Sequence, residues 1–478
     1  MAFLLNFNYQ NNLNCDYRTF RFSNRGIFSK KLGKKVLQSG KQIKMNNQEI
    51  NQDSNENKYW INSILNSEKS KDSPFKDDLR KIGNNLLKIT KIPSKKDESW
   101  RFTKLDRLFN MNFSANTSKM DVEIPKQNFL ENSFARCVFV NGNFSEELSY
   151  KNRKNDPFFL GKFSDLDNKR KNKIIEISGK GESGINGGFF SILNMAGLNE
   201  ITVLYIPENM EINGPIQIIF AQSSSEEICV NQKLIILCEK NSKAEIFQQH
   251  IGSKDSEFFD NATTNILVGE KSKINYFLIN QTSEKSSCFN SIHADLRKQS
   301  DFKIFSFSMG GFLSRLSLGI DLNGIESNCE VEGVSVVKNS QISDLHSRIS
   351  HNYPSCKSSQ LQKNLISENG HAIFAGKIQV HNGASETESS QLCKSLILSP
   401  QSRVDSMPIL EINNENVKCT HGSTVSDLDE DQLFYFTSRG IPEEKARYLL
   451  TLGFVNEMSR KLPKELMDYF SNSVKELI

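Results

Sequence analysis

The sequence predicts a mainly β protein with a β-solenoid core and α-helical segments at both ends. Between about residues 190 and 417, short runs rich in β-branched and aromatic residues alternate with turns of Ser, Asn, Gly and Lys. Several turns resemble one another: Ser242, Ser272, Ser300 and Asn328 follow at intervals of 30, 28 and 28 residues. Before and after this region, apolar residues recur at helical spacing.

A fixed period in this range is typical of a stacked repeat. One coil cannot bury its apolar face alone, so neighbouring coils stack and share a core. The period weakens after residue 333. An ordinary β-sandwich with evenly spaced turns is the alternative.

The N-terminal residues differ in charge from the rest of the chain. Residues 1–44 hold nine Lys and Arg residues against a single acid, Asp16. A basic, acid-poor composition is typical of an organelle transit peptide. The alternatives are a disordered basic tail on a bacterial protein and a start at Met45. Residues 45–57 are polar and predict a disordered linker.

Residues 58–185 predict a helical and loop-rich N-terminal region. Two amphipathic helices are expected between residues 58 and 91, broken near 72–74, and one strand is expected over 135–140. The charged segment 93–110 contains Trp100 and Phe102, which we expect to clamp it to the body of the protein.

The predicted β core covers residues 186–426, and 427–478 predicts a helical domain. Gly440 and Gly453 are expected to end helices, and Pro442 and Pro463 to mark the start and interruption of the following ones. We expect these helices to cap the open strand edge, which would otherwise invite aggregation.

Composition and motifs exclude several function classes. A net charge of +4 over 478 residues does not favour nucleic-acid binding, and no apolar run reaches the ~20 residues of a membrane span. The nine cysteines are scattered without a CxxC pair, which fits a reducing compartment rather than a disulfide framework or a zinc finger. No phosphate-binding loop, dinucleotide fingerprint, HExxH or GxSxG is present, so no nucleotide is expected on this chain.

The stretch KCTHGSTVSDLDEDQLFYFTSRG (418–440) holds the strongest candidate site. Cys419 and His421 are two residues apart, so an extended strand presents both side chains on one face. Thiolate and imidazole are both ligands for transition metals. Two ligands do not close a site, so another segment or a partner must supply the rest. The alternative is a half-buried Cys and a hydrogen-bonded His without a metal.

Both ends of the chain carry motifs that resemble those of the SufB/SufD family of the SUF iron–sulfur cluster assembly machinery. The matching stretches are DESWRFTKLDRL (97–108), FAGKIQVHNGASETESSQ (374–391), LEI (410–412), VKCTHGSTV (417–425), LDEDQLFYFTSRGI (428–441) and ARYLLTLGF (446–454). Ser402 stands where SufB proteins carry a Cys, and Gly422 stands where they carry a Glu. Both departures place the resemblance with the SufD branch.

The resemblance implies a parallel, right-handed β-helix between helical segments, and a scaffold subunit rather than an enzyme. Such chains pair with SufB and bind the SufC ATPase, and they pass clusters to downstream carrier or acceptor proteins. It implies that His421 and Cys419 contact a transient iron–sulfur cluster at the SufB interface. A flavin has been linked to the assembled complex, although no flavin motif is visible here. The candidate SufC-docking residues are Phe434, Tyr435, Arg439, Gly440 and Arg447.

The resemblance and the basic N-terminus together predict the plastid stroma, with the bacterial cytoplasm as the alternative. No nucleic acid and no membrane are expected as partners. Two other functions stay open. One is a purely structural stabiliser of SufB that does not contact iron. The other is a β-helix polysaccharide lyase or hydrolase, which requires a sugar groove along one solenoid face.

Overall fold

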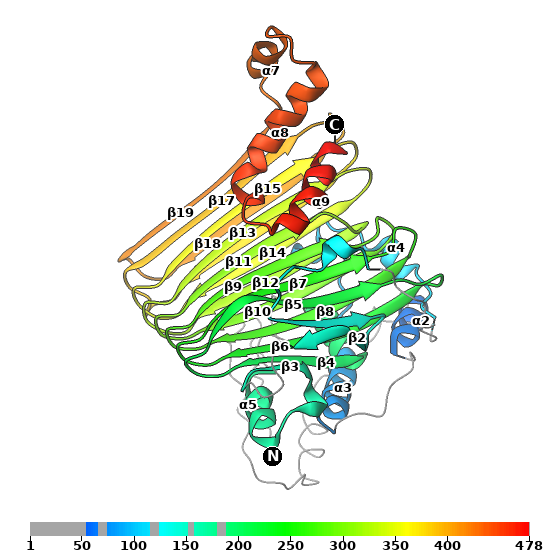
Figure 1. Cartoon of the computed structure of the whole chain (residues 1–478), viewed down its shortest axis with the longest axis vertical. Coiled ribbons are helices and arrows are strands. Elements are labelled where there is room, and N and C mark those ends of the chain that lie inside the picture. The colour runs from blue at the N-terminus through cyan, green and yellow to red at the C-terminus, as the bar shows by residue number, and fades with distance from the viewer. Residues whose placement is uncertain (1–53, 66–73, 115–123, 152–156, 179–187, 478) are drawn as a thin grey trace.

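A computed structural model describes residues 54–65, 74–114, 124–151, 157–178 and 188–477 (Figure 1). The predicted transit peptide and most of the predicted linker lie outside these ranges. The last four linker residues, 54–57, instead begin helix α2 (Ser54–Leu65). None of the helices within the described ranges is long and apolar enough to cross a membrane.

The core is a parallel β-solenoid, as predicted, made of two facing sheets (Figure 1). From β4 onward, successive strands alternate between the sheets, so each coil contributes one strand to each. The ten-stranded sheet contains, in spatial order, β19 (Val417–Ser426), β17 (Thr387–Ile397), β15 (Lys357–Ile366), β13 (Asn328–Val337), β11 (Asp301–Ser308), β9 (Lys273–Gln281), β7 (Lys243–Gly252), β5 (Glu211–Gln222), β1 (Ala135–Val140) and β2 (Asn143–Lys151).

The nine-stranded sheet is built in the same way. It contains β18 (Arg403–Ile412), β16 (His371–Val380), β14 (Ile342–His351), β12 (Leu313–Leu322), β10 (Ser287–Leu296), β8 (Phe258–Val268), β6 (Ile228–Cys238), β4 (Glu200–Ile206) and β3 (Phe159–Lys162). Of the strand pairings among the described residues, two are antiparallel, β1 with β2 and β3 with β4, and both lie at the N-terminal end of the solenoid.

The repeated turns stack at one corner of the solenoid. Each passes through a residue with positive φ, whose backbone N–H donates to a carbonyl of the next coil: Asn241 to Glu270 at 2.9 Å and Ser355 to Ser385 at 2.8 Å are examples. Small buried residues follow these turn residues, namely Ser242, Ser272, Ser300, Ser327, Cys356 and Thr387. The repeat therefore continues beyond residue 333.

The predicted repeat register is wrong by one residue at its fourth member. Asn328 pairs with Asp301, so Ser327 is the equivalent of Ser300. The coil that begins at Ser300 is therefore one residue shorter than expected. Sequence similarity between the turns did not reveal where this coil is shortened.

The interior of the solenoid is divided into two halves. One is apolar and includes Phe220, Ile236, Ile304 and Ile320 from both sheets. The other carries buried polar side chains at inward-facing positions, among them Gln248, His250, Asn280, Asn290, Ser314 and Gln362. Buried polar groups need hydrogen-bond partners, and many of these groups bond to other side chains. For example, Asn280 Nδ2 donates to Ser314 Oγ at 2.7 Å, which links the two sheets.

N-terminal helices cover the outer face of the nine-stranded sheet. They are α2, α3 (Pro74–Leu87), the short η1 (Glu98–Trp100) and α4 (Asp106–Phe109), and α6 (Gly188–Ala196). Helices α2 and α3 confirm the predicted pair of helices, while the residues between them, 66–73, lie outside the described ranges. Trp100 packs against Phe190 and Phe289, and the Arg315 guanidinium lies 3.7 Å from its ring centroid. The expected aromatic clamp is thereby confirmed.

Sequence analysis missed several elements before the solenoid. Strand β1 matches the expected 135–140, and positive φ at Asn141 and Gly142 closes its hairpin with β2. β2, β3 and α5 (Asn168–Ser178) occupy the region expected to be mostly loop, together with the one-turn helices η2 (Lys126–Asn128) and η3 (Phe163–Asp165). Helix α6 lies where strands were expected. It is buried along most of its length, and a helix that is apolar all round lacks the helical period.

The C-terminal helices do not cap the strand edge, so that expectation was wrong. Helix α7 (Glu430–Thr437) stands beyond the end of the solenoid, and α8 (Glu443–Ser459) leads back to α9 (Lys464–Lys475) (Figure 1). Val455, Leu466 and Phe470 join one cluster with Phe307 and Leu365 on the outer face of the ten-stranded sheet. These helices bury their apolar side against a sheet face, where more area is available than at an edge.

Two glycines were predicted to end helices, and the structure tests both positions. Gly440 has φ +81° and follows α7, as expected for a residue that ends a helix. Gly453 does not end α8, which continues to Ser459. Buried Thr451, Val455 and Met458 hold the helix on both sides of this glycine, and tertiary packing outweighs its propensity cost of ~1 kcal/mol.

Candidate functional site

The predicted site lies on the last strand of the solenoid. β19 pairs with β17 on one side, and β18, in the other sheet, pairs with β16. Both are terminal strands in their sheets, so within the described residues each presents an unpaired edge. We call the end formed by β18 and β19 the open end of the solenoid (Figure 1).

Cys419 and His421 share the inward-facing side of β19, as their spacing predicted. Cys419 packs against the buried cluster of Ile378, Val380 and Ala384, and burial raises the pKa of its thiol. His421 lies in register with buried Gln391 of the preceding coil, but is itself exposed. Among the described residues no further coil follows β19, and the His421 side chain is therefore left exposed.

The open end joins the two sheets without completing a metal site. Ser423 Oγ on β19 donates to Ser406 Oγ on β18 at 2.9 Å. Among the described residues, no third His, Cys or carboxylate completes a three-ligand group with Cys419 and His421. Ser402, at the position of the SufB cysteine, donates from Oγ to the Glu368 carbonyl at 3.1 Å. A closed metal site here therefore needs ligands from outside the described chain.

Exposed large apolar side chains gather near this end. Six of the ten described ones lie between residues 409 and 449. Ile412 is 41% exposed and Val425 is 51% exposed on the two terminal strands. Apolar side chains beside unpaired strand edges are typical of an interaction surface.

The predicted docking residues lie on α7 and in the chain that follows it. They are separate from Ile412 and Val425 on the terminal strands. Phe434 is 72% exposed and Tyr435 is 55% exposed. The Arg439 guanidinium lies 4.3 Å from the Tyr435 ring centroid. Gly440 sets the turn into α8, on which Arg447 is half-buried. Asp429 caps α7 by accepting from the backbone N–H groups of residues 431 and 432.

Four further histidines of the solenoid have hydrogen-bonding or ion-pair partners. His351 Nε2 hydrogen-bonds with Ser358 Oγ at 2.9 Å, and His371 Nε2 with Asp405 Oδ2 at 2.7 Å. His346 Nε2 lies 3.0 Å from Asp344 Oδ1, and His381 Nε2 contacts Ser350 Oγ at 3.1 Å.

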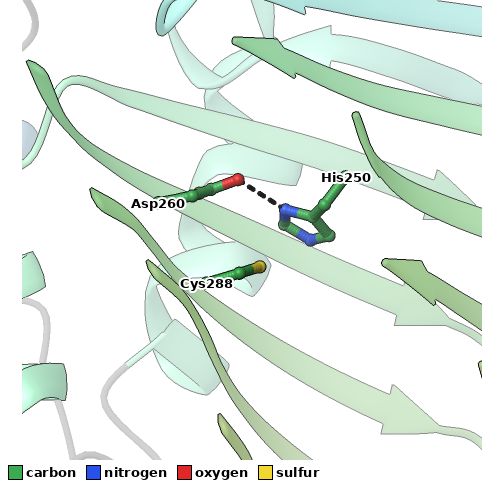
Figure 2. A group of neighbouring side chains, drawn as sticks. All are labelled: His250, Asp260 and Cys288. Atoms are coloured by element: carbon green, nitrogen blue, oxygen red, sulfur yellow. Dashed lines mark hydrogen bonds and ion pairs between the residues drawn. The ribbon is translucent and has the colours of Figure 1, made fainter. Parts of the chain in front are cut away.

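One group of potential ligands was missed entirely. His250, Asp260 and Cys288 come together inside the solenoid (Figure 2). They come from three different strands at separations of 10 and 28 residues, so no local motif signals them. Only the register of neighbouring coils brings Asp260 opposite Cys288.

Two protein-family models match the chain. Residues 61–218 match the SufBD protein N-terminal region, and residues 220–454 match the SufBD core domain of SUF-system iron–sulfur cluster assembly. Together they cover most of the helical N-terminal region, the solenoid and the beginning of the C-terminal helices.

Individual relatives agree with these matches. An iron–sulfur cluster assembly SufBD family protein of Synechocystis is 30% identical over 390 residues, which is 79% of this chain and 86% of that protein. Protein ABCI7, chloroplastic, of Arabidopsis thaliana is 30% identical over 84% of this chain and 86% of its own length. The iron–sulfur cluster assembly protein SufD of Escherichia coli is 24% identical over 79% of this chain and 86% of its own length. The chain therefore belongs to the SufB/SufD family of SUF iron–sulfur cluster assembly proteins.

Proposed function

We propose that this chain is a non-catalytic scaffold subunit of a SUF assembly complex, which pairs with a SufB subunit through the open end of its solenoid. The observation that carries the proposal is the pair of unpaired ten-residue strands, β18 and β19, with exposed apolar residues beside them. A second β-solenoid can add strands to both edges, using main-chain hydrogen bonds for affinity and side chains for specificity.

In this arrangement His421 and Cys419 lie at the subunit interface. The cluster is the cargo of the complex, and this chain supplies up to two of its contacts. His421 is the stronger candidate because its imidazole is exposed toward the space that the partner would fill. Cys419 is partly packed against the cluster of Ile378, Val380 and Ala384, so it must become deprotonated and turn outward to bind iron.

We also assign the SufC contact to α7 and the start of α8. Phe434 and Tyr435 offer exposed aromatic anchors, and Arg439 is held beside Tyr435. Aromatic residues and arginine dominate binding energy at protein interfaces. Because α8 and α9 pack firmly on the ten-stranded sheet, movement of a bound ATPase at α7 would be transmitted to the solenoid.

The direct test is anaerobic cluster reconstitution on the co-expressed complex with SufB and SufC. His421→Ala should lower cluster absorbance several-fold while gel filtration shows an intact complex, and Cys419→Ser should have a smaller effect. The matched control is His381→Ala, which removes the imidazole of an exposed histidine that follows β16 and is not part of either terminal strand. Normal cluster yield with His421→Ala would contradict a role for His421 as a ligand. It would favour the alternative that this chain only stabilises SufB.

SufC docking has its own test. Phe434→Ser with Tyr435→Ser should weaken SufC binding at least about tenfold, since each removes an aromatic anchor. Tyr353→Ser is the control because Tyr353 is also exposed, at 46%, but lies on a turn of the solenoid. If both variants bound SufC equally well, the docking surface would not include Phe434 and Tyr435.

The compartment that we propose is the plastid stroma. The supporting observations are the basic, acid-poor N-terminus and the similarity to a chloroplastic Arabidopsis protein. Fusing residues 1–60 to a fluorescent protein tests this, with plastid import expected and a cytosolic signal contradicting it. Family membership also removes the ground for the carbohydrate-active alternative, since that alternative rested on the solenoid shape alone.

A further inference from the structure

The polar half of the solenoid interior contains three potential metal ligands from both sheets. His250 lies on β7 of the ten-stranded sheet, while Asp260 and Cys288 lie on β8 and β10 of the nine-stranded sheet. Figure 2 shows the three side chains converging across the gap between the sheets. All three residues are at most 1% exposed.

The potential ligand atoms of these residues lie within 4.8 Å of one another. Ligands of a tetrahedral ion at bond lengths of about 2.0–2.3 Å are roughly 3.3–3.8 Å apart. Movements of about 1 Å, which side-chain rotations can supply, would therefore close the group around one ion. Because register places Cys288 beside Asp260 on neighbouring strands, the backbone already fixes two of the three positions.

An unsatisfied polar atom points to a missing partner at this place. His250 Nδ1 and Asp260 Oδ2 are 2.7 Å apart, but Asp260 Oδ1 is buried and accepts no hydrogen bond from the described residues. A buried carboxylate oxygen without a partner destabilises the fold, because its lost hydration is not replaced. Metal coordination is one of the few ways in which a charge is accommodated in a protein interior.

We propose that His250, Asp260 and Cys288 form a buried site for one divalent transition-metal ion, zinc or ferrous iron. Imidazole, carboxylate and thiolate together suit these borderline ions rather than magnesium or calcium. A divalent ion with one carboxylate and one thiolate is electrically neutral, which favours it in a buried environment.

Coordination requires a simple proton balance. His250 binds through Nδ1 while its proton moves to Nε2, and the Gln248 side-chain amide, whose nitrogen lies 2.8 Å from Nε2, turns to present its oxygen to that proton. The Cys288 thiol loses its proton to solvent as the metal–sulfur bond forms. A cavity of about 40 Å³ lined by Cys288 and Asn290 adjoins the group and has room for a water as the fourth ligand. The site is distinct from Cys419 and His421, and does not depend on the function proposed for them.

Cobalt is the first probe, because Co²⁺ bound to thiolate gives a charge-transfer band. The full chain carrying Cys419→Ser and His421→Ala would be expressed in Co²⁺-supplemented medium, so that the interior closes around the ion. We expect about one cobalt per chain and a sulfur-to-cobalt band. Cys288→Ala should remove the band, whereas Cys238→Ala, at a buried cysteine of the apolar half, should leave it unchanged.

Metal analysis is the second measurement. It uses conservative substitutions, in case Cys288→Ala folds poorly, and it also identifies the native ion. His250→Gln and Asp260→Asn should each lower bound metal at least about tenfold. Metal analysis of the chain grown without cobalt, aerobically and anaerobically, distinguishes zinc from iron. Removing the metal should lower the Tm of the unsubstituted chain but not that of these variants. Absence of the band from the parent chain, or its persistence in Cys288→Ala, would overturn the proposal.

Discussion

The two ends of the solenoid are finished in different ways. At the N-terminal end, the ten-stranded sheet terminates in β2 and the nine-stranded sheet in β3, and both pair antiparallel to their neighbours. β3 has only four residues, and β2 carries exposed Glu146 and Glu147. Short strands and charges are the usual means of blocking further strand addition. We call this the closed end.

The open end differs in the length of its strands, although Arg403, Glu411 and Lys418 are charged and exposed there as well. β18 and β19 have ten residues each, keep the parallel register of the coils before them, and expose Ile409, Ile412 and Val425. The helices that could have covered these strands pack on a sheet face instead. We therefore infer that the open end, which carries Cys419 and His421, is better suited than the closed end to continue into another solenoid.

Charges on the open end should give the largest effect. Ile412→Lys with Val425→Lys would place two ammonium groups in the interface that we propose for SufB, where uncompensated burial costs several kcal/mol. We expect association to weaken at least about 1,000-fold, or ~4 kcal/mol, measured by calorimetry. The control at the closed end, Glu146→Lys with Glu147→Lys, should change affinity less than about twofold. Equal loss from both pairs would contradict the distinction between the ends.

The anchor of the C-terminal helices should be next in size. Phe470 is fully buried, and its ring centroid lies 5.9 Å from that of Phe307. Phe470→Ala should lower the free energy of unfolding by about 3 kcal/mol, measured by urea denaturation. The exposed Phe434 provides the control, since Phe434→Ala should change it by less than about 0.5 kcal/mol. Similar small effects at both positions would mean that α9 is not anchored on the sheet.

A pH effect should be smaller and should come from His351 in the C-terminal half. Burial lowers the pKa of His351 to about 4 in the folded chain, against about 6.5 when unfolded. The unfolded chain therefore binds the proton first as pH falls, so stability is lost between about pH 6.5 and 4. The loss should be on the order of 2–3 kcal/mol. His351→Gln should show a correspondingly flatter pH dependence of Tm, and an unchanged slope would contradict this cause.

Sequence patterns predicted what depends on neighbours along the chain. β-Branched runs and similar turns indicated the solenoid, and the two-residue spacing of Cys419 and His421 correctly predicted that they share a face. Gly440 signalled a helix end because its positive φ is a local requirement.

Features that depend on neighbouring coils were not predictable. The shortened coil before Ser327, the buried helix α6 and the helix that continues through Gly453 are fixed by packing. The meeting of His250, Asp260 and Cys288 depends on register across the two sheets. The position of α8 and α9 on a sheet face likewise follows from apolar residues distant in sequence.

The central claim, that the open end and not the closed end receives the SufB subunit, can be measured by hydrogen exchange. Amide exchange of the full chain would be followed by mass spectrometry with and without SufB. Unpaired edge amides exchange readily, and strand addition protects them. We predict new protection in residues 403–412 and 417–426, with little change in residues 143–151. Protection confined to 143–151, or unchanged exchange at the open end in an intact complex, would contradict the account.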